Sequence, residues 1–183
     1  MEKSVLVPVA DGTEELEAVA IIDVLRRAGA AVTMASVSGD RQITASREVV
    51  IIADDLIEAC VEKDYDLVVL PGGIPGAQNL RDSDPLKQIL IRQREKDRLY
   101  GAICASPAIV LEHHGLLAGH QATCHPGFTD GLADKTRIDE PVVMDGTCLT
   151  SRGAGTAVIF ALALVERLYS KDKRDEVAAS LAI

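Results

Sequence analysis

The stretch Leu99-Tyr100-Gly101-Ala102-Ile103-Cys104-Ala105-Ser106-Pro107 decides how this chain folds. It opens with a short apolar run, which is typical of a buried strand. Pro107 suits the first turn of a helix, because the N–H that proline lacks would have no partner there. The sequence therefore predicts a strand over residues 99–103 and a helix over residues 108–114, with Cys104 at the junction between them.

Cys104 would thus stand near the amino end of a helix. A thiol in that place faces unpaired N–H groups and the positive end of the helix dipole. Both favour the thiolate, which is the nucleophilic form, so the sequence predicts a reactive cysteine with a lowered pKa. The alternative is a small buried hydrophobic side chain, which is how free cysteine often behaves.

Strands and helices alternate along the rest of the chain. Further strands are predicted over residues 4–10, 31–37, 66–70 and 121–124, with a strand pair over 43–53 and a hairpin over 142–150. Further helices are predicted over residues 14–28, 56–62, 75–80, 85–95, 155–169 and 174–181. This alternation predicts an α/β fold, as one domain over residues 1–183, with a mostly parallel sheet covered by helices on both faces.

Ligands bind such sheets beyond the carboxyl ends of the strands. Three loops that follow predicted strands would meet there, at residues 11–14, 71–73 and 104–106. The glycines of the second loop, Gly72 and Gly73, would let backbone N–H groups approach a reacting oxygen and form an oxyanion hole. A plain tight turn is the alternative.

Composition and charge argue against several classes of function. The formal net charge of −9 speaks against a nucleic-acid or anionic membrane surface, since both need clustered Lys and Arg. The longest apolar run, residues 157–165, is too short to span a bilayer, and no signal peptide is visible, so a cytoplasmic protein is expected. The cysteines match no zinc-binding spacing and are expected to be reduced. They are Cys60, Cys104, Cys124 and Cys148.

Glu17 is the candidate partner of the cysteine. It heads an apolar stripe on the first predicted helix, so its carboxyl would point inward, toward the rim of the sheet. That stripe continues through Ile21, Val24 and Ala28. A desolvated carboxyl has a raised pKa and can donate a proton near neutral pH. Glu14 lies one turn earlier on the same face; a solvated acid of the first turn is the alternative, and it fits Glu15 well.

His125 is the candidate histidine of the site. It follows a predicted strand and precedes Pro126-Gly127, so it can lie on the same rim and pair with a thiol. The other three histidines suit surface or helix-end positions. Residues 151–156 form either an anion site at a helix N-terminus or a capping loop. A salt bridge is the simplest interpretation of Arg47.

With these residues placed, the chain closely resembles the ThiJ/PfpI family, in the branch of the parkinsonism-associated protein deglycase. The resemblance runs over residues 3–181 and is carried by specific motifs. They are Gly12-Thr13-Glu14-Glu15-Leu16-Glu17, Val69-Leu70-Pro71-Gly72-Gly73, Ala102-Ile103-Cys104-Ala105-Ser106-Pro107, Thr123-Cys124-His125-Pro126 and Thr150-Ser151-Arg152-Gly153-Ala154-Gly155-Thr156. The resemblance implies a flavodoxin-like three-layer sandwich and a homodimer.

The resemblance also implies roles for individual residues. The nucleophilic cysteine, its protonated glutamate partner and the site histidine correspond to Cys104, Glu17 and His125. The glycine loop corresponds to Gly72 and Gly73, and the arginine that reaches toward the site across the dimer corresponds to Arg47. Backbone N–H groups near Gly73 and Ala105 would stabilise an oxyanion.

Several positions depart from the family pattern. Ser106 stands two residues after the nucleophile, where relatives carry Gly or Ala, and Ala154 replaces a proline. Ala45 and Ile52 stand where animal relatives have auxiliary cysteines, and Cys124 instead lies beside the site histidine. A redox scheme that needs those auxiliary cysteines is therefore not expected.

The implied function is an enzyme that acts on α-oxoaldehydes such as methylglyoxal and glyoxal, or on their early protein and nucleotide adducts. It would need no glutathione, metal or organic cofactor. Two other classes stay open. A redox-sensing protective protein or chaperone would use the same oxidisable cysteine, and a hydrolase or amidase would use a Cys–His pair. Glu17 and the distance in sequence between Cys104 and His125 argue against the last class.

Overall fold

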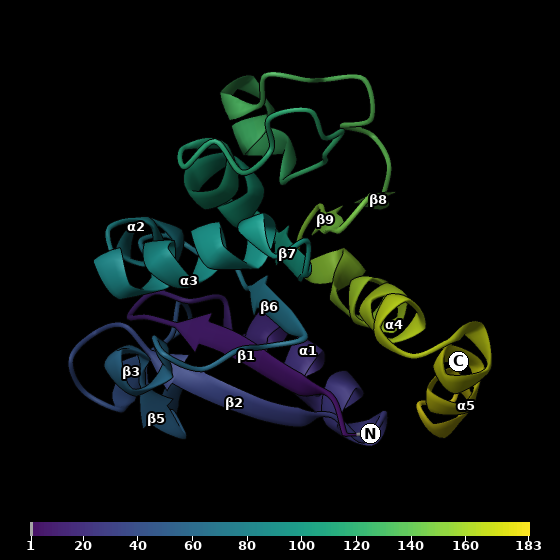
Figure 1. Ribbon diagram of the computed structural model, residues 1–183, viewed down its shortest axis with the longest axis horizontal. Coiled ribbons are helices and arrows are strands. Elements are labelled where there is room, and N and C mark those ends of the chain that lie inside the picture. Colours follow the sequence, from purple (N-terminus) through teal and green to yellow (C-terminus); the bar gives the residue numbers. More distant parts are fainter. Residues whose placement is uncertain (1) are drawn as a thin grey trace.

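The computed structural model describes residues 2–183, and a seven-stranded sheet forms its centre (Figure 1). In spatial order the strands are β5 (Asp55–Leu56), β2 (Ala31–Ser36), β1 (Ser4–Val9), β6 (Leu67–Leu70), β7 (Leu99–Ile103), β9 (Cys148–Ser151) and β8 (Val142–Asp145). All neighbours pair in parallel except β8 and β9, which form an antiparallel hairpin. The predicted mostly parallel sheet and its edge hairpin are confirmed.

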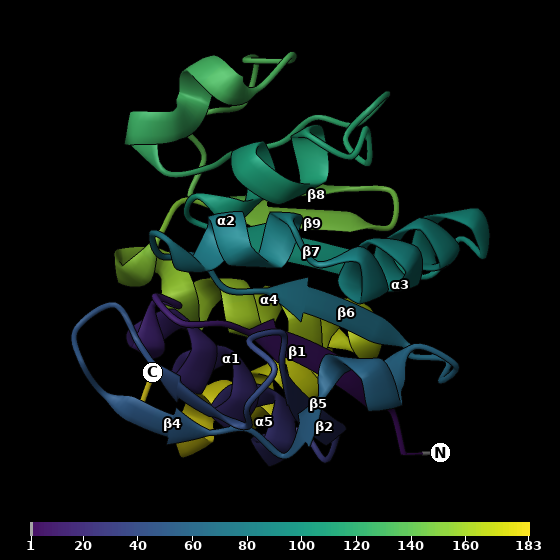
Figure 2. The same ribbon diagram turned by 90° about the vertical axis from the view of Figure 1, so that its left-hand side faces the viewer.

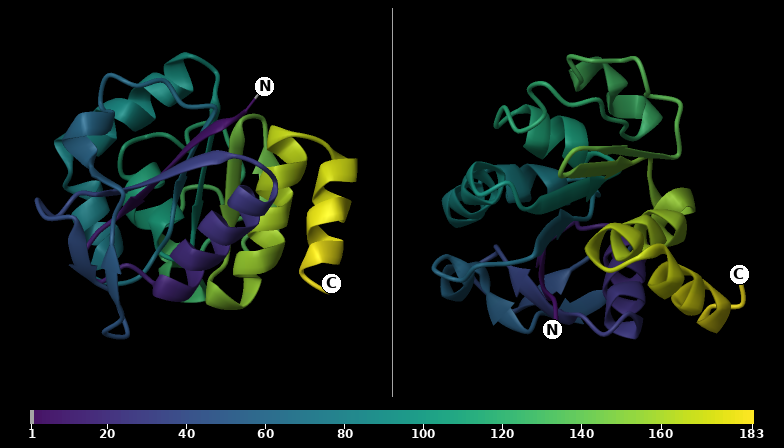
Figure 3. Two further views of the ribbon diagram at one scale, coloured as in Figure 1. Left: turned by 90° about the horizontal axis from the view of Figure 1, so that it is seen from below. Right: turned by 45° about the vertical axis from the view of Figure 1, so that its right-hand side comes forward.

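Helices cover both faces of this sheet (Figure 2). One face carries α1 (Glu15–Arg27) and α4 (Ala157–Leu168), which lie side by side, with α5 (Lys171–Ser180) packed on α4 (Figure 3). The other face carries α2 (Gly76–Arg81), α3 (Asp84–Glu95) and a π-helix, η2 (Pro107–Glu112).

Successive residues of the central strands divide between the two apolar cores. In β1, Val5 and Val7 belong to the core beneath α1 and α4, whereas Leu6 belongs to the core on the face of α2 and α3. This division explains why the central strands are apolar throughout, since both of their sides are buried. No helix within residues 2–183 combines the length and the apolar character needed to cross a membrane.

The remaining elements are short. Strands β3 (Gln42–Thr44) and β4 (Val50–Ile52) form the predicted strand pair as a separate antiparallel hairpin. Short 3-10 helices complete the fold, and they are η1 (Ile57–Cys60), η3 (Pro126–Gly131) and η4 (Ala154–Thr156).

Three predicted elements differ from the structure. Residues 121–124 form no strand, because side chains replace a backbone ladder: Gln121 N–H donates to Asp145 and Thr123 N–H donates to Thr150 Oγ1. The helix predicted over 56–62 is edge strand β5 followed by η1. The helix predicted over 108–114 is the π-helix η2, which begins at Pro107.

Candidate active site

Cys104 directly follows β7 and has a backbone φ of +65°. This left-handed conformation costs a residue with a side chain about 1–3 kcal/mol, so the surrounding structure must impose it. Contacts on both sides do so, since Cys104 N–H donates to Ser151 O (3.1 Å) and Cys104 O accepts from His125 N–H (2.8 Å). The sharp turn presents the sulfur at the carboxyl end of the sheet.

A cleft of about 600 Å³ opens at this end of the sheet. It brings together six of the predicted site residues, which are Glu17, Arg47, Gly73, Cys104, Ala105 and His125. The seventh, Gly72, lies behind Cys104: a Cβ added to Gly72 would come within 2.5 Å of Cys104 Cβ. Residues from five separate segments of the chain therefore converge on one cleft.

Glu17 lies in the first turn of α1 and is fully buried. Its Oε2 accepts a hydrogen bond from Gly72 N–H (2.8 Å), while its Oε1 has no partner among residues 2–183. Burial raises the pKa of Glu17 to about 7, with a smaller contribution from the charge of Glu14. The inward orientation that the apolar stripe predicted is thus present, and the carboxyl can gain or lose a proton near neutral pH.

The pKa of Cys104 differs from the sequence prediction. Burial and, second, the charge of Glu17 raise the pKa of this thiol to about 12. The backbone N–H groups of Gly73 and Ala105 lie near the sulfur and act in the opposite direction. The prediction of a lowered pKa was wrong, because it took account of the helix terminus and left out the desolvation of the thiol and its acidic neighbour.

Glu17 and Cys104 are best described as one acid–base pair. A charged Glu17 raises the pKa of the Cys104 thiol, so the pair resists carrying two negative charges, whereas the neighbouring thiol lowers the pKa of Glu17. Loss of a single proton near pH 7 leaves a carboxylate beside a thiol, which can exchange the remaining proton to become a carboxylic acid beside a thiolate. A thiolate is therefore available at the moment of attack without being the resting form.

The two glycines of the 71–73 loop have different contacts. Gly72 N–H is engaged by Glu17, so it is not free to stabilise an oxyanion as the sequence predicted. Gly73 has a φ of +94°, which favours glycine, and its N–H lies near the Cys104 sulfur. The N–H groups of Gly73 and Ala105, which Glu17 does not engage, remain as the candidate oxyanion donors.

His125 stands at the rim of the cleft and is exposed. Its Nδ1 accepts a hydrogen bond from Gly127 N–H (3.1 Å), so in the neutral ring the proton is on Nε2. No hydrogen bond joins its ring to Cys104 anywhere in the described residues. The resting structure therefore lacks the Cys–His pair that a hydrolase would need.

Arg47 lines the cleft from the loop between β3 and β4, and its side chain is exposed. Its guanidinium donates to Ser46 O and forms no ion pair within residues 2–183, so the salt-bridge interpretation was wrong. Glu15 anchors this loop, since its carboxylate accepts from Ser46 Oγ (2.9 Å) and Arg47 N–H (2.9 Å). Glu15 is therefore a structural acid and not the freely solvated one predicted.

The loop over residues 151–156 precedes α4 and lines the cleft. Thr156 Oγ1 accepts from Gly153 N–H (3.1 Å) at the start of η4, whereas Thr156, the N-cap residue of α4, makes no side-chain cap bond to α4 itself. Arg152 of this loop also lines the cleft, as does Phe128, which packs edge-on against His125. Sequence reasoning missed both as site residues, although Arg152 lies in a loop already marked as a possible anion site.

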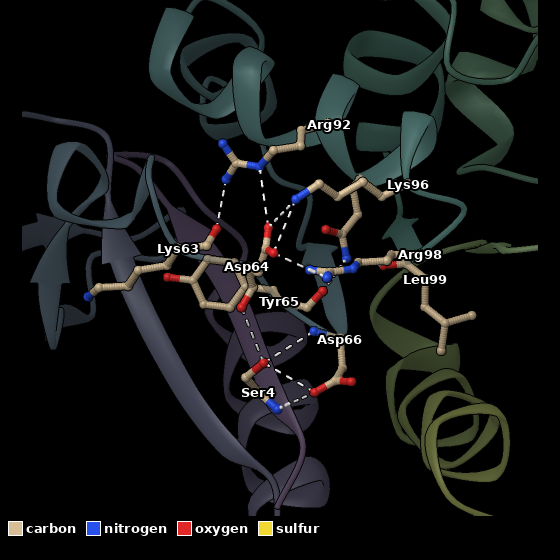
Figure 4. A network of polar contacts seen from close by, with 10 residues as sticks. Ser4, Lys63, Asp64, Tyr65, Asp66, Arg92, Lys96, Arg98 and Leu99 are labelled. Atoms are coloured by element: carbon tan, nitrogen blue, oxygen red, sulfur yellow. Dashed lines mark hydrogen bonds and ion pairs between the residues drawn. The ribbon is translucent and has the colours of Figure 1, made fainter.

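A second polar pocket, of about 430 Å³, lies at the amino end of the sheet. There Asp64 pairs with Lys96 (2.9 Å) and Arg98 (3.2 Å) (Figure 4). Asp66 pairs with Lys3 (3.3 Å). These side chains are partly exposed, and each acid has a base as its partner. No group of three or more metal-ligating side chains with a suitable arrangement occurs in residues 2–183. The carboxyl-end cleft is therefore the candidate active site.

Comparisons with known proteins agree with this geometry. Protein DJ-1 homolog B of Arabidopsis thaliana is 49% identical over 169 residues, which is 92% of this chain. The chain spans 39% of the length of that relative. The glutathione-independent glyoxalase DJR-1.2 of Caenorhabditis elegans is 32% identical over 181 residues, covering 98% of this chain and 95% of the relative.

Solved structures give the same result. The structure titled Toxoplasma gondii DJ-1, oxidized, is 45% identical, covers 98% of both chains and superposes with a TM-score of 0.96. The family model described as DJ-1/PfpI matches residues 3–167. This chain belongs to the DJ-1/PfpI family.

Proposed function

We propose that this protein is an enzyme that converts α-oxoaldehydes such as methylglyoxal and glyoxal into 2-hydroxy acids without glutathione. One observation carries the proposal: the Cys104 sulfur shares a cleft with a buried carboxyl, Glu17, whose pKa is raised to about 7. A nucleophile and a group that exchanges protons at neutral pH are what this reaction requires. The relative named as a glutathione-independent glyoxalase supports the same reaction.

The first step is attack of the Cys104 sulfur on the aldehyde carbon. Glu17 takes the thiol proton as the S–C bond forms, and the aldehyde oxygen becomes an oxyanion. The N–H groups of Gly73 and Ala105, which lie near the sulfur, would stabilise that oxygen. Return of the proton to the oxygen gives a hemithioacetal.

The second step moves a hydrogen along the substrate. Glu17 removes the proton from C1 while His125 donates from Nε2 to the C2 oxygen, where negative charge develops, and an enediol forms. Glu17 then returns its proton to C2 and the C1 hydroxyl gives its proton back to His125, which leaves the thioester of a 2-hydroxy acid. Water then cleaves the thioester and releases the acid and the free Cys104 thiol. The net reaction adds one water to the oxoaldehyde.

The same cleft suits early adducts of these aldehydes on protein or nucleotide groups. It is open to solvent and has His125 and Arg47 exposed at its edge, so a substrate held on a larger molecule can reach the sulfur. Free aldehyde and such adducts interconvert, so deglycase activity and glyoxalase activity would use the same steps.

Lactate formation from methylglyoxal, without glutathione, tests the proposal. Wild type should form lactate, while Cys104→Ser and Glu17→Gln should each lose at least about a hundred-fold in rate. Cys60→Ser is the matched control, because Cys60 is buried in the core on the other face of the sheet. Absence of lactate with wild type, or full activity in Cys104→Ser, would contradict the proposal.

A second candidate function is redox sensing through the same thiol. Cys104 is partly exposed, whereas Cys60, Cys124 and Cys148 are buried. Oxidation to sulfenic and then sulfinic acid follows thiol exposure. After limiting peroxide, peptide mass mapping should find two added oxygens on Cys104 before any on the other three cysteines. Oxidation that begins at one of the buried cysteines would contradict this candidate.

A homodimer is part of the proposal. Large apolar side chains are exposed on α1 and on β4, next to the loop that carries Arg47, and a monomer rarely leaves such a group in water. They are Leu16, Val19, Val50 and Ile52. Light scattering should give twice the chain mass for wild type and a single chain mass for Val50→Lys. An unchanged dimer in that variant would exclude this surface as the interface.

A further inference from the structure

Ser106 carries a buried hydroxyl that the proposed mechanism does not use. The side chain is 0% exposed, and its Oγ donates to Pro71 O at 2.6 Å, a short hydrogen bond. Ser106 is also the N-cap residue of η2, where a serine normally accepts a bond from a backbone N–H of the first turn. No such cap bond is present, so the hydroxyl is directed to the neighbouring loop instead.

The carbonyl that Ser106 holds belongs to the peptide unit that contacts Glu17. Pro71 C=O and Gly72 N–H are two ends of one planar group, so fixing one end orients the other. Ser106 holds the carbonyl end, and Gly72 N–H donates to Glu17 Oε2 at 2.8 Å. Within residues 2–183, the Ser106 hydroxyl is the one donor to Pro71 O.

Little space is available for this peptide to move without affecting the site. Pro71, Gly72 and Gly73 are all buried, and Gly72 lies directly against Cys104. A buried carbonyl that loses its hydrogen-bond donor is destabilised, and turning toward another donor lowers its free energy. Such a turn would take Gly72 N–H away from Glu17, and it would disturb Gly73, the next residue along the same loop.

We propose that Ser106 is a positioning residue of this site, whose hydroxyl holds the Pro71–Gly72 peptide so that Gly72 N–H faces Glu17. The inference rests on the proposed roles of Glu17 and Cys104. Ser106 touches neither the substrate nor the sulfur through this hydroxyl; it acts through the peptide.

The direction of the expected effect follows from the Gly72 bond, which lowers the pKa of Glu17 against the larger effect of burial. Without that bond, the pKa of Glu17 rises, and the reactive, singly deprotonated pair forms only at higher pH. A hydrogen bond to a charged group contributes enough to shift the pH at which half of the pairs are singly deprotonated by about one unit. That pH is the midpoint of the pH dependence of Cys104 reactivity. At pH 7 the reactive fraction then falls by about five-fold.

The test measures the rate of Cys104 alkylation by iodoacetamide from pH 5 to pH 9, with the modified residue identified by mass. Ser106→Ala and Ser106→Gly should raise the midpoint by about one unit, and Ser106→Thr, which keeps a hydroxyl, should restore it. Tyr100→Phe is the matched control, because the Tyr100 hydroxyl also donates to a buried carbonyl, Leu116 O at 2.8 Å. It should leave the midpoint unchanged.

A second comparison separates action through Glu17 from general loosening. In a Glu17→Gln background no carboxyl titrates beside the thiol, so the alkylation rate should show no midpoint near pH 7, and Ser106→Ala should leave that pH profile unchanged. An unmoved midpoint in Ser106→Ala, an equal shift in Tyr100→Phe, or a full shift in the Glu17→Gln background would overturn the proposal. The readout is independent of turnover: a shifted midpoint in a protein that makes no lactate would refute the proposed enzyme and leave the positioning role intact.

Discussion

The two pockets lie at opposite ends of the same sheet, and they shift the pKa of a carboxyl group in opposite directions. At the carboxyl end, Glu17 is buried without a basic partner, and its pKa is raised to about 7. At the amino end, Asp64 lies in water between Lys96 and Arg98, and hydrogen bonding to Lys96 lowers its pKa. Burial without a counter-ion produces a carboxyl that moves protons at neutral pH, whereas pairing in solvent keeps a carboxylate permanently charged.

The largest expected effect comes from the glycine behind the sulfur. Gly72→Ala places a Cβ within 2.5 Å of Cys104 Cβ and 3.0 Å of Glu17 Oε2, so the loop and the turn must separate. We expect the rate of Cys104 alkylation to fall by about a hundred-fold, because misplacement of reacting groups by about 1 Å has effects of that order. Gly155→Ala, in the same cleft, meets nothing within 4 Å and should react like wild type. Equal rates in the two variants would show that the close contact is not needed.

The next effect is a dependence of stability on pH at Glu17. The pKa of Glu17 in the folded protein is raised above its value in the unfolded chain. The contribution of Glu17 to stability is therefore fully present below the unfolded pKa and is lost as pH rises through about 7. Chemical denaturation should therefore find that Glu17→Gln gains about 3 kcal/mol relative to wild type between pH 4 and pH 9. Glu15→Gln is the control, since the pKa of Glu15 is lowered and its pH dependence should have the opposite sign. A constant difference between Glu17→Gln and wild type would mean that Glu17 is not buried as a lone carboxyl.

The smallest effect is expected at the amino-end pocket. Asp64 has a lowered pKa in the folded protein, so its contribution is present above the unfolded pKa and is lost as pH falls through the folded pKa. Asp64→Asn should lower Tm slightly at pH 7 and not at pH 3, and added salt should reduce the difference, because exposed ion pairs are screened. Lactate formation and Cys104 alkylation should not change. A large loss of either would show that the two pockets are coupled.

Much of the fold follows from local patterns. The apolar strands, helix α1 and the Asp145-Gly146 hairpin were all predicted, because each depends on residues close together in the chain. The strand predicted at 121–124 was wrong, because hydrogen-bond partners from distant residues, Asp145 and Thr150, decide how that segment pairs. Its composition alone carries no sign of them.

The features of the candidate site also fall into two groups, those that local sequence predicts and those that contacts between distant segments decide. The sequence by itself determined that a cysteine ends a central strand, that Glu17 faces inward and that the glycine loop reaches the same rim, since the alternation of strands and helices and the helix periodicity are local patterns. Only the tertiary structure decided the left-handed turn at Cys104, the raised pKa of its thiol and the engagement of Gly72 by Glu17, 55 residues away. Desolvation and hydrogen-bond geometry depend on atoms that distant segments bring together, and for that reason the chemistry of the pair cannot be read from either segment alone.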